Sequence, residues 1–143
     1  MMPDLDYFQW GYHFKPTFCC NSVIQGTWAI YMNVLSYFNG SFPNAGSGAV
    51  NDEIQFKFGQ KAGAYTFRLL CQTGLVYAII TIYIDGVSQG TIDLWSAGPN
   101  VYNVVKTLAV TIVKDGEHTL NIKATGTTGG TYYVATVGWW LTG

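Results

Sequence analysis

Charged side chains are scarce in this chain of 143 residues. Asp, Glu, Lys and Arg make up 10% of the sequence, whereas an ordinary soluble domain has about 25%. The formal net charge is −1 and no basic run occurs, so nucleic-acid binding through phosphate neutralisation is not expected. A monomer normally covers much of its surface with charged groups. The shortage therefore favours a subunit of a homo-oligomer, with a trimer as the expected form, or of a larger assembly.

Long apolar segments are also missing. No apolar run approaches the roughly 20 residues that a membrane-spanning helix needs, so no membrane partner is expected. The N-terminal stretch MMPDLDYFQWGYHFK has neither a basic segment nor a clean apolar one, which does not fit a signal peptide. We therefore expect synthesis in a cytoplasm.

Cysteine is rare, and its three positions are Cys19, Cys20 and Cys71. Their odd number and the lack of a CxxC pair do not support a zinc site. Cys71 has the strand parity of Phe67 and Leu69, which predicts a small buried apolar side chain. A disulfide from Cys71 to Cys19 or Cys20, formed after release from the cell, remains the alternative.

A helical period is absent throughout, and strand-like alternation takes its place. In EIQFKF, for example, the apolar side chains face one way, and Gln55 and Lys57 face the other. Segments of this kind are separated by turns rich in Gly, Asn and Asp, which predicts an antiparallel β-sandwich of jelly-roll type with about eight or nine strands. The side chains expected to face the core include Ile54, Phe56, Phe58, Tyr65, Phe67, Leu69, Cys71, Ile80, Ile82, Ile84, Ile92, Leu94, Leu120, Ile122, Ala124, Tyr133, Ala135, Val137, Trp139 and Leu141.

Asp85-Gly86 is the clearest turn signal in the chain, because a type I′ hairpin turn needs positive φ at both central residues. Pairing the flanking strands at this turn puts Ile92 out of phase with Val87. One extra residue must be absorbed between them, and we expect a β-bulge at Gly90.

Residues 1–26 differ from the rest, because they are rich in aromatic side chains but have no clean period. We interpret them as an N-terminal arm, followed by a jelly-roll domain at 27–143. The arm either covers an edge of its own sheet or contacts a neighbouring subunit or capsid protein by adding to a sheet edge. The contact residues expected in the second case are Tyr7, Phe8, Trp10, Tyr12 and Phe14.

The motifs NDEIQFKF, AGAYTFRLL, ITIYIDGVSQGTIDLW, YNVV and GEHTLNIKATG follow one another in this order. Together they resemble a β-sandwich module of bacteriophage tail-fibre and virion-surface proteins, which is similar to the galactose-binding-like jelly rolls of carbohydrate-binding modules. The resemblance extends from Asn51 to Leu141. It implies a fold and a location on the virion surface, but no ligand, because the same sandwich serves in capsid decoration, fibre tips and sugar binding.

Catalytic chemistry has little support in the sequence. The chain has eight acidic residues, and Asp85 and Asp115 are expected in turns, which leaves few candidates for the paired carboxylates of a glycosidase. His118 has core parity at the start of a strand and is expected to be a structural residue, since no Ser or Cys nucleophile has a recognisable setting. No run places oxygen ligands at alternating positions, so we expect no calcium or other cofactor.

Sugar binding needs an exposed aromatic ring with amides or acids beside it, because the apolar face of a sugar stacks on the ring. The candidates near expected loops are Tyr77, Trp95, Asn100, Tyr102 and Asn103. The alternative is that these rings close the ends of the sandwich or fill a subunit contact.

The sequence thus predicts a non-enzymatic phage structural protein. The main hypothesis is a capsid decoration or cement protein, which binds the major capsid protein or another virion protein. The alternative is a carbohydrate-binding, receptor-recognition module of a tail fibre, whose partner is a surface glycan.

Overall fold

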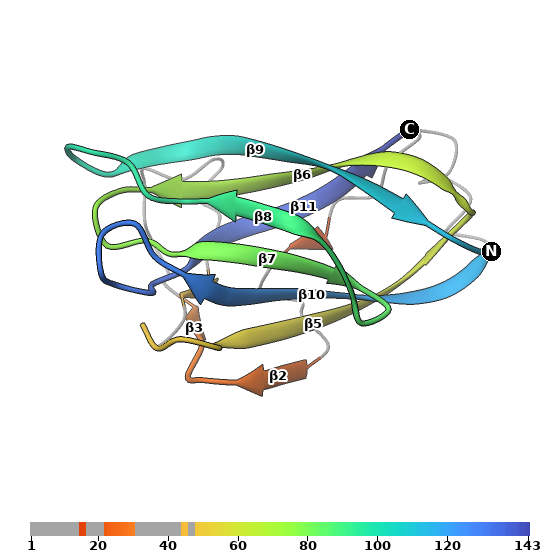
Figure 1. The fold of residues 1–143 in the computed structure, drawn as a ribbon, viewed down its shortest axis with the longest axis horizontal. Coiled ribbons are helices and arrows are strands. Elements are labelled where there is room, and N and C mark those ends of the chain that lie inside the picture. Colours follow the sequence, from red (N-terminus) through yellow and green to blue (C-terminus); the bar gives the residue numbers. More distant parts are fainter. Residues whose placement is uncertain (1–14, 17–21, 31–43, 46–47) are drawn as a thin grey trace.

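Two antiparallel β-sheets pack face to face in the computed structural model, which describes residues 15–16, 22–30, 44–45 and 48–143 (Figure 1). The first sheet has the spatial order β3 (Ala29–Ile30), β4 (Asn44–Ala45), β11 (Ala135–Thr142), β6 (Gly63–Thr73) and β9 (Val101–Ile112), with β1 (Lys15–Pro16) also pairing with β11. The second has the order β2 (Ser22–Gln25), β5 (Glu53–Gln60), β10 (Gly116–Gly126), β7 (Ile79–Ile84) and β8 (Val87–Asp93).

The strand count agrees with the sequence-based expectation. Eight of these strands have four residues or more, and β1, β3 and β4 have two each. All pairings between the named strands are antiparallel, so the prediction of an all-β, jelly-roll sandwich is confirmed. In the described part of the chain, no helix is long and apolar enough to cross a membrane.

The core lies between the sheets, where the alternating apolar side chains meet. Trp139 of β11 is 1% exposed, and its ring makes edge contacts with Phe56 and Phe58 at centroid distances of 5.6 and 5.4 Å. Burying large apolar side chains of this kind stabilises the fold by about 1.5–3 kcal/mol each. Of the side chains expected to face inward, all but two are buried; the exceptions are Tyr65, which is half-buried, and Tyr133.

Tyr133 is 43% exposed, so the prediction that it faces the core is wrong. β11 begins only at Ala135, and Tyr133 lies in the preceding loop, where it forms an isolated parallel bridge with Tyr77. The alternation of the strand therefore does not extend to it.

The hairpin and its bulge are confirmed. Asp85 and Gly86 have φ values of 51° and 81°. Ile82 pairs with Gly90 while Tyr83 pairs with Ser88, so one extra residue is accommodated on β8 between them. Gly90 has φ 131°, which suits glycine rather than a residue with a side chain.

The expected N-terminal arm is described only in part. Ser22–Gln25 forms β2 and pairs with β5, and Lys15–Pro16 pairs with β11. The composition NGSFPNAGSGAVN predicts a loop over residues 39–51, but Asn44–Ala45 within it forms β4. The division at residue 26 stays a prediction. The following residues lie outside the described part of the chain: Tyr7, Phe8, Trp10, Tyr12, Phe14, Cys19 and Cys20.

The two ends of the sandwich differ in their connections. Segments 48–52, 74–78, 94–100 and 127–134 gather at one end, which we call the loop end, on the left of Figure 1. Short turns at 61–62, 85–86 and 113–115 lie at the opposite end, which we call the turn end.

Candidate functional site

The loops of the loop end are joined by backbone hydrogen bonds. Gly74 N donates to Leu94 O at 3.2 Å, and Ala78 N donates to Tyr133 O at 2.9 Å. Tyr133 N donates in return to Val76 O at 3.2 Å. Segment 74–78 is thus fixed to both 94–100 and 127–134, and the surface they form is held in place before any ligand arrives.

Two carboxylates also brace this end. Asp93 accepts hydrogen bonds from Trp95 N and from Thr128 Oγ1, both at 2.8 Å, so it joins segments 94–100 and 127–134. Asp52 is 1% exposed and accepts a hydrogen bond from Ala49 N at 3.2 Å. Each carboxylate therefore already has a structural role.

Glycines bring the backbone against the aromatic rings. A Cβ on Gly129 would lie 2.5 Å from Trp95 Nε1 and 2.7 Å from Leu75 O. A Cβ on Gly48 would lie 2.8 Å from Cζ of Tyr133. Only glycine fits against these two rings, so the loops fix the positions of Trp95 and Tyr133.

The five sugar-binding candidates fall into two groups. Trp95 is half-buried, and Asn100, Tyr102 and Asn103 are exposed, the last two at the start of β9. Tyr77 is 8% exposed and belongs to the hydrophobic core. Its placement fits the alternative in which a ring closes the end of the sandwich. We therefore leave Tyr77 out of the candidate contact surface.

The structure adds residues that the sequence did not single out. The exposed Tyr133 lies in segment 127–134, and Leu75 and Val76 are also exposed beside it. Thr131 Oγ1 is buried and has no hydrogen-bond partner among the described residues. The one sequence signal for this part of the surface is the Gly-rich composition of residues 127–130, which indicates a loop before Thr131 and Tyr133. The loop end thus combines exposed aromatic rings and amides.

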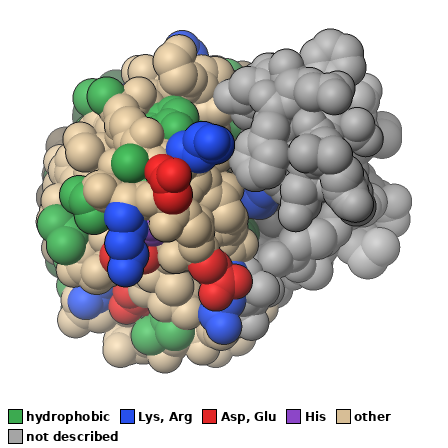
Figure 2. Space-filling model, turned by 90° about the vertical axis from the view of Figure 1, so that its right-hand side faces the viewer, with side chains coloured by type: hydrophobic (Ala, Val, Ile, Leu, Met, Phe, Trp, Pro, Cys, Tyr) green, Lys and Arg blue, Asp and Glu red, His purple; other side chains and the backbone are tan. Residues whose placement is uncertain are grey.

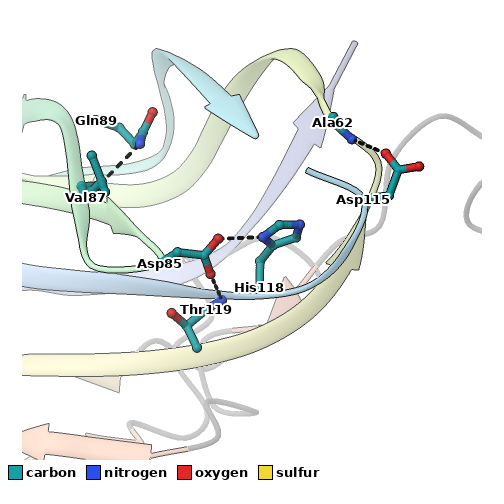
Figure 3. A network of polar contacts seen from close by, with 7 residues as sticks. All are labelled: Ala62, Asp85, Val87, Gln89, Asp115, His118 and Thr119. Atoms are coloured by element: carbon teal, nitrogen blue, oxygen red, sulfur yellow. Dashed lines mark hydrogen bonds and ion pairs between the residues drawn. The ribbon is translucent and has the colours of Figure 1, made fainter. Parts of the chain in front are cut away.

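The turn end has a different character. Figure 2 shows Lys, Asp and Glu side chains gathered on this face. Asp115 Oδ1 accepts a hydrogen bond from Ala62 N at 2.8 Å, which joins the turns at 61–62 and 113–115 (Figure 3). This end is therefore charged and closed by tight turns.

His118 is the buried ionisable group of the turn end. Its Nδ1 lies 2.6 Å from Asp85 Oδ2, and Thr119 N donates to Asp85 Oδ1 at 3.0 Å (Figure 3). Desolvation alone would raise the pKa of the Asp85 carboxyl. The hydrogen bonds with His118 and Thr119 lower this pKa by a larger amount, so it falls below its ordinary value. The pair ties the β7–β8 turn to β10, as expected of a structural histidine.

Metal ligands are not clustered in the structure. Across residues 15–16, 22–30, 44–45 and 48–143, no three His, Cys, Asp or Glu side chains are grouped so that they could hold a metal ion. Cys71 is fully buried, and burial raises the pKa of its thiol to about 12. The prediction of a buried apolar role for Cys71 is confirmed.

Comparison with known proteins identifies relatives by fold. No protein-family model and no curated protein matches the sequence. A family 35 carbohydrate binding module from an environmental isolate matches with a TM-score of 0.68 and 16% identity, over 92% of this chain and 93% of that one. The CBM36-1 domain of a multidomain xylanase from the hindgut metagenome of Trinervitermes trinervoides matches with a TM-score of 0.65 and 16% identity, over 92% and 97%.

Some similar structures are much longer enzymes. The Paenibacillus xanthan lyase matches with a TM-score of 0.74 and 17% identity over 91% of this chain, which spans only 13% of the lyase. Two matches that cover nearly the whole partner are carbohydrate-binding modules. This chain therefore has the galactose-binding-like jelly-roll fold of such modules. The phage origin implied by the sequence resemblance stays a prediction.

Proposed function

We propose that this domain is a non-catalytic carbohydrate-binding module whose ligand lies on the loop end. The observation that carries the proposal is that Trp95 and Tyr133 flank segment 74–77 on the braced loop end, with the exposed Asn100, Tyr102 and Asn103 on the stretch of chain that follows Trp95. A sugar ring stacks its apolar face on an aromatic side chain, and amides hydrogen-bond its hydroxyl groups. A surface that is already ordered loses less conformational entropy on binding.

The fold supports this proposal and favours it over capsid decoration. Two full-length structural matches are carbohydrate-binding modules, although fold alone does not assign a ligand. The homotrimer, expected from the scarcity of charge, and the capsid partner and virion-surface location, expected from the resemblance, stay predictions. A receptor-binding role in a tail fibre would be compatible with the proposed module.

The experiment is a glycan-array screen of the full chain, followed by calorimetry with the best oligosaccharide. Trp95→Ala and Tyr133→Ala should each weaken binding about tenfold, since about 1.4 kcal/mol corresponds to that factor and a large ring contributes at least as much when buried. Val113→Ala is the matched control, because Val113 is 79% exposed at the turn end and its loss should leave affinity unchanged. Equal effects of all three variants would exclude the loop end as the site.

A further inference from the structure

The distribution of positive charge restricts the kind of glycan that fits the loop end. All seven Lys and Arg side chains of the sequence lie in its described part, and the remaining residues add Asp4, Asp6 and His13. None of the seven belongs to segments 48–52, 74–78, 94–100 or 127–134. They are Lys15, Lys57, Lys61, Arg68, Lys106, Lys114 and Lys123.

The cations are engaged or placed elsewhere. Lys61 and Lys114 lie within the tight turns of the turn end. Arg68 lies within β6, where its Nε donates to Thr142 Oγ1 at 3.0 Å. Lys123 lies within β10, in register with Glu53 of β5. Lys106 of β9 and Lys123 of β10 thus belong to strands and not to the loop segments.

Asp93, the last residue of β8, is an exposed carboxylate at the loop end. Each of its oxygens accepts a hydrogen bond from a neighbouring loop, at Trp95 N and at Thr128 Oγ1. An anionic sugar at this surface would meet the negative charge of Asp93 without a compensating cation. Removing a charged group from water without such a partner is costly.

We propose, on the basis of the proposed function, that the ligand of the loop end is an uncharged glycan, recognised by ring stacking and neutral hydrogen bonds. Uronate-containing, sulfated and sialylated glycans are rejected. Salt screens interactions between charges, because the Debye length shrinks from about 30 Å at 0.01 M to about 3 Å at 1 M ionic strength. Since no ion pair forms between this surface and its ligand, the affinity for the glycan does not depend on salt.

The test is affinity electrophoresis of the full chain in gels that contain galactomannan or xyloglucan as neutral polysaccharides, or polygalacturonate or alginate as acidic ones. Each gel is run at low and high NaCl, and with calcium or a chelator. Retardation by at least one neutral polysaccharide is expected, with a dissociation constant that changes less than twofold across these conditions. Binding to the acidic polysaccharides should be at least tenfold weaker.

A pair of charge variants sharpens the result. Ala97→Lys adds a cation to the exposed part of segment 94–100 and should increase retardation by polygalacturonate at low salt. Val113→Lys makes the same charge change at the turn end and should alter neither class of binding. Acidic binding equal to neutral binding, or dependent on calcium, would overturn the inference and leave the proposed module intact. Binding to neither class, here and in the glycan-array screen, would overturn both.

Discussion

Gly129→Ala tests whether the loops hold Trp95 where the proposed site needs it. The added Cβ would lie 2.5 Å from Trp95 Nε1 and 2.7 Å from Leu75 O. Favourable contacts between such atoms need about 3.5–4.0 Å, so the indole or segment 127–134 must move by roughly 1 Å. The carbonyl of Leu75 belongs to a hydrogen-bonded loop, and we therefore expect the ring to be displaced.

The magnitudes follow from overpacking and chain entropy. Overpacking costs about 1–3 kcal/mol, and the reduced freedom of the unfolded chain offsets about 0.4–1 kcal/mol. The net loss of roughly 0–2.6 kcal/mol should lower the melting temperature by up to about 10 °C in a domain of this size. A weakened ring contact of about 0.5–1.5 kcal/mol should reduce glycan affinity between twofold and tenfold.

Gly59→Ala is the matched control, because no heavy atom lies within 4 Å of its Cβ position and its φ is not positive. Thermal melts and calorimetry of both variants decide the question. Gly59→Ala should keep its affinity and its melting temperature or gain slightly. If Gly129→Ala behaves in the same way, the close packing of Trp95 against this loop cannot be what positions the site.

Three further predictions concern the scaffold. Gly90→Val should lower the melting temperature by roughly 2–12 °C, because positive φ strains a β-branched residue by about 1–3 kcal/mol and its Cβ would lie 3.1 Å from Leu108 Cδ1. Ser88→Val on the same strand should change the melting temperature little, and equal effects of the two variants would argue against the bulge. Asp85 has a folded-state pKa below its ordinary value, so the ionised carboxylate stabilises the fold above about pH 4, and this stabilisation is lost as the pH falls through the lower folded value. In thermal melts from pH 7 to pH 2, the melting temperature of Asp85→Asn should therefore fall less steeply than that of the original chain. Identical declines in melting temperature would refute the role of the carboxylate. The Cys71 thiol, with its pKa of about 12, should resist alkylation at pH 8 in the folded protein and react in denaturant, as followed by peptide mass spectrometry; rapid labelling of the folded protein would contradict its burial.

Local patterns made much of the sandwich predictable. The parity of residues 54–58 and 120–124, the Asp85-Gly86 turn and the phase change at Gly90 each depend on neighbours within a few residues. The period of a strand fixes the face of every side chain on it, so the core could be assigned from sequence alone wherever a strand was continuous.

The candidate site was less accessible because it is made of loops. Tyr133 was assigned to the core because the start of β11 cannot be read from alternation. Asp93 and Thr128 meet through a hydrogen bond between residues 35 positions apart. The Asp85–His118 pair likewise joins residues 33 positions apart. Such contacts depend on how the two sheets are connected, and a local pattern carries no information about that.

The central claim, that the loop end binds an uncharged glycan, is tested most directly by nuclear magnetic resonance titration of the isotope-labelled chain with a neutral oligosaccharide from the array. The account predicts that amide shifts concentrate in segments 74–78, 94–103 and 127–134, with a large change at the Trp95 indole N–H. Shifts that map to the turn end, or to the strands of either sheet away from these loops, would contradict it.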